Sequence, residues 1–251
     1  MRKNTLIAVA ILLLIIQINK NFAQQRILII TSNNHYFGNT KIPIGNHFEE
    51  IVSAYNIFNY SGFKVDIVSS QGGAIPLNHI NTSDSIQKRY LFDGSFMDLL
   101  EHTLKPNQIF PNNYSAVYFS GGGSAMFGVA DNIEIQKIAL QVFENNGIIS
   151  AVCHGTAGIV FLKDPGGNSI YRGKKITGFP SFFERKNQPY YPTFSFDIDS
   201  IIRVNGGEFV FSDKGWDGFF VIDGQFITGQ DPSSVVNVAN KIVEKLKLQN
   251  H

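Results

Sequence analysis

Residues 148–158, IISAVCHGTAG, decide the fold of this chain. The apolar run 148–152 is typical of a buried parallel strand, and the small residues at 155–158 would open a helix packed closely on the sheet. Cys153 stands at the junction between them. A side chain at such a strand-to-helix turn is lifted clear of the sheet and lies near the N–H groups of the helix. The stretch therefore predicts a nucleophile elbow, with a thiol that ionises below its ordinary pKa of about 8.5.

Cys153 also admits a simpler interpretation, because a lone cysteine between apolar residues is often a small core filler. The neighbouring His154 and the glycines that follow are poor core material and favour the nucleophile. Cys153 is the only cysteine of the chain. No intrachain disulfide can form, so the fold must rest on its hydrophobic core.

Strands and helices alternate on both sides of the elbow. We expect strands at 26–31, 65–69, 116–119 and 148–152, helices at 47–60, 132–145 and 233–248, and a hairpin of 219–222 with 225–228. Short glycine loops between them predict an α/β fold with a doubly wound, mostly parallel sheet and helices on both faces. The less regular segments 78–112 and 181–217 are interpreted as insertions that flank the site.

Length and charge limit the classes of protein that this chain can be. Its 251 residues suit one α/β domain, which we assign to 24–251. The net charge is +1 without a basic stripe, so nucleic-acid binding has no electrostatic support.

The pattern of residues 1–23 is typical of a secretory signal peptide. Arg2 and Lys3 precede the apolar run 6–16, and Ala23 offers a small residue for cleavage. The run of about 11 residues is shorter than the roughly 20 that span a bilayer. We expect an exported protein, periplasmic or secreted, without stable membrane insertion after cleavage; an uncleaved anchor is the alternative.

Loops that follow the parallel strands meet at one edge of the sheet, where such folds bind ligands. Cys153 is the candidate nucleophile, and His154 beside it offers a general base and a backbone N–H. Gly121, Gly122 and Gly123 end a neighbouring strand with N–H groups suited to a developing oxyanion.

Two acidic residues are further candidates for this site. Glu50 could bond the sulfur or move protons, and Glu184 could orient the imidazole. Their positions in the sequence also fit a solvated helix residue and a loop ion-pair partner. The other histidines have no metal-ligand spacing, so we expect no metal.

Six motifs, taken in order, are specific together, although each is weak alone. They are GNHFEEI at 45–51 followed by Tyr55, VDIVSSQGGAIP at 65–76, the glycines 121–123 with Met126 and Phe127 close behind, AVCHG at 151–155, GKKITGF at 173–179 and ITGQDPSS at 227–234. In these motifs the chain resembles the ThiJ/PfpI superfamily, and within it the class that contains glyoxalase III and heat-shock chaperone relatives. The resemblance runs from about Arg26 to Leu246.

This resemblance implies a flavodoxin-like fold, of the kind found in class I glutamine amidotransferases, and a homodimer. It implies that Cys153 is the nucleophile beside His154, that Glu50 bonds the sulfur and that Glu184 completes a triad. The oxyanion donors fall on the backbone of Gly122 and His154. Two departures bear on substrate preference and on the placement of Glu184: Ser120–Gly123 replaces a frequent Pro-Gly-Gly-His, and Pro180 replaces a frequent Thr.

Three functional hypotheses follow from these residues together with the resemblance. The first is a cofactor-independent glyoxalase, or a related deglycase, that converts methylglyoxal or glyoxal to a hydroxy acid without glutathione. The second is a cysteine hydrolase or an amidotransferase-like acyl transfer. The third is a non-enzymatic chaperone or redox stress protein whose cysteine reports oxidation.

Overall fold

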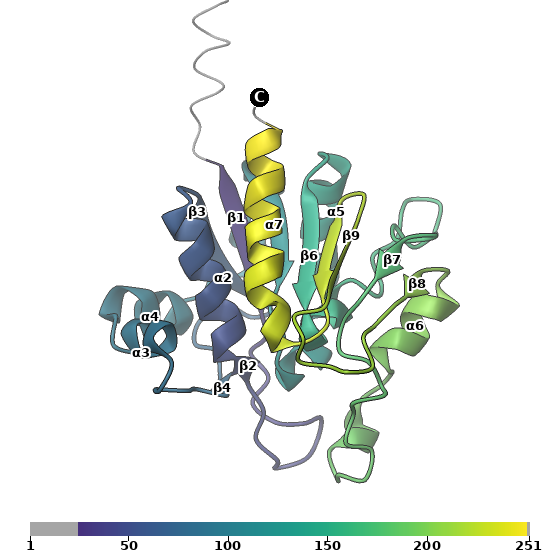
Figure 1. Cartoon of the computed structure of the whole chain (residues 1–251), viewed down its shortest axis with the longest axis horizontal. Helices are drawn as coiled ribbons and strands as arrows, with labels where there is room; N and C mark the ends of the chain where they lie inside the picture. The colour runs from purple at the N-terminus through teal and green to yellow at the C-terminus, as the bar shows by residue number, and fades with distance from the viewer. Residues whose placement is uncertain (1–24, 250–251) are drawn as a thin grey trace, which may run out of the picture.

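The computed structural model describes residues 25–249, so the expected signal peptide lies outside the described residues. Within that range the central sheet has six strands in the order β3-β1-β5-β6-β10-β9 (Figure 1). They are β1 (Arg26–Thr31), β3 (Lys64–Ser69), β5 (Tyr114–Phe119), β6 (Ile148–Val152), β9 (Phe220–Asp223) and β10 (Phe226–Gly229). β9 pairs antiparallel with β10, while the other neighbours are parallel. The expected α/β fold with a mostly parallel sheet is confirmed.

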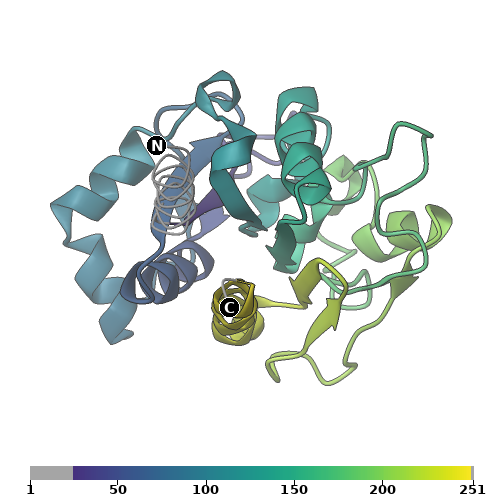
Figure 2. The ribbon, with the colours of Figure 1, turned by 90° about the horizontal axis from the view of Figure 1, so that it is seen from above.

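Helices cover both faces of the sheet because alternate strand residues point to opposite sides. Ile27 and Ile29 of β1 belong to one core cluster, under α2 (Phe48–Tyr60) and α7 (Val235–Leu248). Leu28 and Ile30 belong to the other cluster, under α5 (Ile133–Glu144). Figure 2 shows α2 and α7 on one side of the sheet and α5 on the other.

Shorter elements complete the chain. The helices are α3 (Ser85–Leu91), α4 (Gly94–Glu101) and α6 (Ile198–Val204), and the short strands are β2 (Asn46–His47), β4 (Leu77–Asn78), β7 (Lys175–Ile176) and β8 (Glu208–Phe209). The 3-10 turns are η1 (Pro106–Gln108), η2 (Pro111–Asn113), η3 (Gly123–Met126), η4 (Cys153–Gly158), η5 (Tyr191–Thr193) and η6 (Pro232–Ser234). Within residues 25–249 no helix has the length and apolar character needed to cross a membrane.

The segment after β6 differs from the helix that the sequence predicts. Residues 153–158 form the 3-10 helix η4 instead of opening an α-helix. Gly155 and Gly158 press so closely on Phe119 that a Cβ at either position would collide with that residue. A short 3-10 segment lacks the aligned peptide dipoles of a long α-helix. Individual N–H groups, and not a helix dipole, must therefore act on Cys153.

The C-terminal hairpin is displaced by one residue from its expected position. β9 ends at Asp223 and β10 begins at Phe226, so the turn consists of Gly224 and Gln225. Gly224 has a φ of +60°, which glycine adopts readily. The turn therefore forms with Gly224 as its first residue, which shifts the hairpin by one position.

Candidate active site

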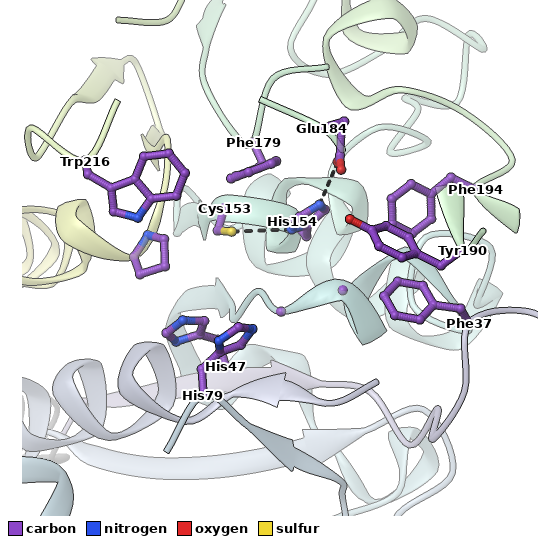
Figure 3. Close-up of a pocket in the computed structure, with 13 residues that line it drawn as sticks. Phe37, His47, His79, Cys153, His154, Phe179, Glu184, Tyr190, Phe194 and Trp216 are labelled. Atoms are coloured by element: carbon purple, nitrogen blue, oxygen red, sulfur yellow. Dashed lines mark hydrogen bonds and ion pairs between the residues drawn. The ribbon is translucent and has the colours of Figure 1, made fainter. Parts of the chain in front are cut away.

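Cys153 lies at the carboxyl end of β6, directly after Val152, and faces a pocket (Figure 3). Its φ of +57° is in the left-handed region, which a residue with a side chain rarely adopts. Such strain persists where the surroundings hold it, and it is common at functional sites. The predicted elbow is therefore present, although a 3-10 turn follows it.

The imidazole of His154 lies between the thiol and Glu184. Its Nδ1 is 3.4 Å from Cys153 Sγ, and its Nε2 is 2.8 Å from Glu184 Oε1. A carboxylate accepts a hydrogen bond from Nε2–H, which leaves Nδ1 free to take a proton from sulfur. Phe179 stacks on the imidazole at 4.5 Å between ring centroids and holds its plane. The structure thus brings together the three residues of the expected triad.

Glu50 lies in the first turn of α2 and is completely buried. The Gly121 N–H donates to its Oε2 at 2.7 Å, and an interaction with the Cys153 side chain also lowers the pKa of this carboxyl. Its Oε1 is buried and has no hydrogen-bond partner within residues 25–249. Burial raises the pKa of Glu50 well above its ordinary value, and the bond from Gly121 only partly opposes this. The carboxyl therefore tends to keep its proton and can donate it.

The acidity of Cys153 differs from our expectation. Burial, first, and the negative charge of an ionised Glu50, second, raise the pKa of the thiol well above its ordinary value. The backbone N–H groups of His154 and Gly122 act in the opposite direction. The expected low thiol pKa is wrong for this site because desolvation outweighs two N–H groups. The resting thiol needs a base to remove its proton.

The glycine loop after β5 leaves space for these contacts. A Cβ on Gly121 would lie 2.7 Å from Glu50 Oε2 and 2.9 Å from the Cβ of Cys153. Gly122 has a φ of +93°, and its N–H points to the sulfur. The Gly121 carbonyl accepts from the His47 N–H at 3.0 Å, which holds the peptide between the two glycines. Gly123 lines the pocket beside them.

The pocket above Cys153 has a volume of about 380 Å³, within the range of small-molecule sites. Segment 181–217 contributes Glu184, Tyr190, Phe194 and Trp216, and His79 comes from segment 78–112. The other lining residues are Phe37, His47, Gly122, Gly123, Cys153, His154, Phe179 and Pro232.

Our sequence reasoning missed the aromatic residues of this lining and the pair His47 and His79. The spacing of the histidines indicates only that they do not form a metal site. The position of His47 three residues before Glu50 was the available signal, since that spacing places both on one side of a helix start. Across residues 25–249, no three His, Cys, Asp or Glu side chains form a group that could hold a metal ion.

Comparisons with known proteins identify a matching family model and similar proteins. The model of the DJ-1/PfpI family matches residues 42–245. Glyoxalase 3 of Candida albicans is 28% identical over 232 residues, which cover 86% of this chain and 96% of that protein. The glutathione-independent glyoxalase HSP31 of Saccharomyces cerevisiae is 26% identical, covering 88% of this chain and 97% of that protein.

Solved structures show the same fold. The Rapid Encystment Protein 24 kDa of Francisella tularensis superposes with a TM-score of 0.83 at 26% identity, covering 89% of this chain and 99% of that one. Glyoxalase III of Candida albicans superposes with a TM-score of 0.80 at 25% identity, covering 88% of this chain and 96% of that one.

Proposed function

Because this chain belongs to the DJ-1/PfpI family, we propose that it is a glutathione-independent glyoxalase. Its substrate would be a small 2-oxoaldehyde such as methylglyoxal, or glyoxal, and its product the corresponding hydroxy acid. The named relatives support the reaction class, and the chain covers nearly their whole length. A deglycase reaction on early adducts of these aldehydes would use the same groups.

One observation carries the proposal: two proton-transfer groups, the His154 imidazole and the Glu50 carboxyl, interact with the Cys153 side chain. His154 Nδ1 is 3.4 Å from the sulfur and is oriented by Glu184, while the buried Glu50 carboxyl interacts with the same side chain. A simple thiol nucleophile needs one base. A glyoxalase must also move a carbon-bound proton to the neighbouring carbon, so a second proton carrier suits it better.

The first step forms a bond between Sγ and the aldehyde carbon. His154 Nδ1 takes the thiol proton as sulfur attacks, and the carbonyl electron pair moves to oxygen. The N–H groups of Gly122 and His154, which already point to the sulfur, are placed to stabilise this oxyanion. Return of the proton from His154 to the oxygen gives a neutral hemithioacetal.

The second step moves hydrogen between the two substrate carbons. His154 removes the proton from the hemithioacetal carbon and passes it to the second carbonyl oxygen, which gives an enediol. Glu50 then donates its proton to the second carbon and recovers one from the hydroxyl of the sulfur-bearing carbon, where a carbonyl forms. The result is a thioester of the hydroxy acid on Cys153. Water then breaks the bond between sulfur and the acyl carbon, and the thiol recovers its proton. The sum is addition of one water molecule to the 2-oxoaldehyde.

The decisive experiment incubates the purified mature protein with methylglyoxal in the absence of glutathione and measures lactate. We expect turnover by the wild type and only background with Cys153→Ala. Glutamine serves as a second substrate in parallel, because ammonia release without lactate would favour acyl transfer. A wild-type protein that forms no lactate, or a Cys153→Ala variant that is equally active, would overturn the proposal.

A further inference from the structure

Two imidazoles line the pocket together with Cys153, and the reaction steps above do not use them (Figure 3). His47 ends β2 and His79 follows β4, and these short strands pair in parallel with His47 opposite Asn78. The rings stack with centroids 4.6 Å apart and planes 13° from parallel. His79 has a φ of +56°, an unusual conformation that turns its ring onto His47.

Both rings are neutral near pH 7. Burial lowers the pKa of His47 to about 3, with smaller effects from His79 and His154. Burial also lowers the pKa of His79, and His154 adds to the effect. A neutral imidazole has one N–H donor and one acceptor nitrogen. Each ring can therefore donate one hydrogen bond.

The surroundings of His47 indicate which nitrogen holds its hydrogen. Nδ1 is buried and has no hydrogen-bond partner in the described part of the chain. An unpaired buried acceptor occurs more often in proteins than an unpaired buried N–H, which is rare. The hydrogen accordingly belongs on Nε2, the nitrogen that remains available to the pocket.

The backbone places His47 next to the oxyanion donors. The His47 N–H bonds the Gly121 carbonyl at 3.0 Å, and the following N–H, that of Gly122, points to the sulfur. This bond fixes the Gly121–Gly122 peptide with its N–H directed away from the carbonyl and towards the sulfur. The His47 side chain lines the same pocket, so the group that would hold the first substrate oxygen and the residue that could hold a second face one cavity. The two oxygens of a 1,2-dicarbonyl are separated by only two carbon atoms. Adjacent donors fit this substrate class.

We propose that His47 Nε2–H donates a hydrogen bond to the second carbonyl oxygen of a bound 1,2-dicarbonyl, with His79 as a positioning residue that stacks on it. This rests on the proposed function. The hydrogen bond stabilises the negative charge that develops on that oxygen as the carbon-bound proton leaves. A neutral imidazole is a known electrophile for such proton transfers. His47 would thus favour dicarbonyls over simple aldehydes.

The test compares lactate formation by His47→Phe, His47→Gln and His47→Asn with the wild type. Phe keeps a ring for stacking but has no donor, and we expect kcat to fall about 10²-fold. The Gln amide nitrogen reaches approximately the position of Nε2, and the Asn nitrogen that of Nδ1. Gln should therefore recover more activity than Asn. His79→Ala should cause a smaller loss that His79→Phe partly recovers.

A second measurement separates this role from a structural one. Methylglyoxal deuterated at the aldehyde carbon should show a larger isotope effect on kcat in His47→Phe, because breaking the C–H bond becomes rate-limiting. The exposed His102→Asn is the control for replacing a histidine. An active wild type with an equally active His47→Phe, or an unchanged isotope effect, overturns the role of His47 alone. A wild type without turnover overturns the proposed function as well.

Discussion

Glu50 and Cys153 place two acidic groups in one buried site. Desolvation is the largest cause that raises the pKa of both groups, and an ionised Glu50 raises the pKa of the Cys153 thiol further, whereas the Cys153 side chain lowers the pKa of Glu50. The site therefore resists holding two negative charges, and at least one proton stays between carboxyl and thiol. This retained proton is what the proposed reaction needs, because the second substrate carbon must receive one.

Glu50→Gln should change how stability depends on pH. A carboxyl whose pKa is raised on folding binds its proton more tightly in the folded state, so its contribution to stability is present below pH about 4.3 and is lost as pH rises towards the folded pKa. Relative to Glu50→Gln, the wild type should lose up to about 1.4 kcal/mol of unfolding free energy per pH unit in that window.

Urea denaturation of both proteins at several pH values from 4.5 to 8 measures this difference. Glu101→Gln, at the exposed end of α4, is the matched control and should show no such divergence. If the unfolding free energies of the wild type and Glu50→Gln changed with pH in parallel, Glu50 would have an ordinary pKa in the folded protein.

At the scale of elements, α2, β5 and β6 converge at the glycine loop. Gly121 follows β5 by two residues and touches Glu50 from α2 and Cys153 after β6. Helix and strand ends can approach this closely because no side chain separates them. The arrangement of the site therefore depends on this loop as much as on the catalytic side chains.

Gly121→Ala should damage both stability and activity. Its Cβ would lie 2.7 Å from the Val152 carbonyl as well as from the Glu50 carboxyl, so the backbone must shift. We expect a loss of about 1–3 kcal/mol in unfolding free energy. The rate of lactate formation should fall by more than the fraction of unfolded protein explains, because Glu50 and the Gly122 N–H move away from the sulfur.

Gly94→Ala is the control for Gly121→Ala. No atom lies within 4 Å of its added Cβ, and the residue begins α4. It should keep wild-type activity and unfold at the same or a slightly higher denaturant concentration. Chemical denaturation and the lactate assay on both variants decide the matter; a fully active Gly121→Ala would show that the loop tolerates a side chain.

At the scale of the whole molecule, the expected export signal and the domain are separable. The sheet begins with β1 at Arg26, so cleavage after Ala23 would remove no residue of it. The homodimer expected from the family resemblance stays a prediction, since the structure contains one chain.

We predict that the mature protein begins near Gln24 and is found outside the cytoplasm. Arg2, Lys3 and the apolar run 6–16 are the physical basis, because a basic start and a short apolar segment direct export. Mass spectrometry of the intact protein from cell fractions checks this, with Arg2→Glu and Lys3→Glu together as the variant that should slow export. An intact Met1 on cytosolic protein would contradict it.

Local pattern in the sequence was enough to predict the strands of the sheet, the elbow at Cys153 and the neighbouring His154. Apolar runs, helical spacing and glycine positions act over a few residues, and burial of the resulting faces determines the α/β arrangement. For Glu50 and Glu184 the sequence left two interpretations open, and the family resemblance favoured the proposed site roles over a solvated helix residue and a loop ion-pair partner. Strand and helix ends were predicted less well, as the hairpin shows, because single residues such as Gly224 decide them.

Only the tertiary structure decided how distant segments meet in the pocket. Glu184 reaches His154 from a loop 30 residues later, and His47 and His79 stack because two short strands pair. The raised pKa of Cys153 likewise results from burial by the whole fold, although the local motif predicted the opposite direction. The neighbours of a residue in the folded structure determine how strongly it is desolvated and which groups it contacts. The spacing of residues along the chain does not specify those neighbours.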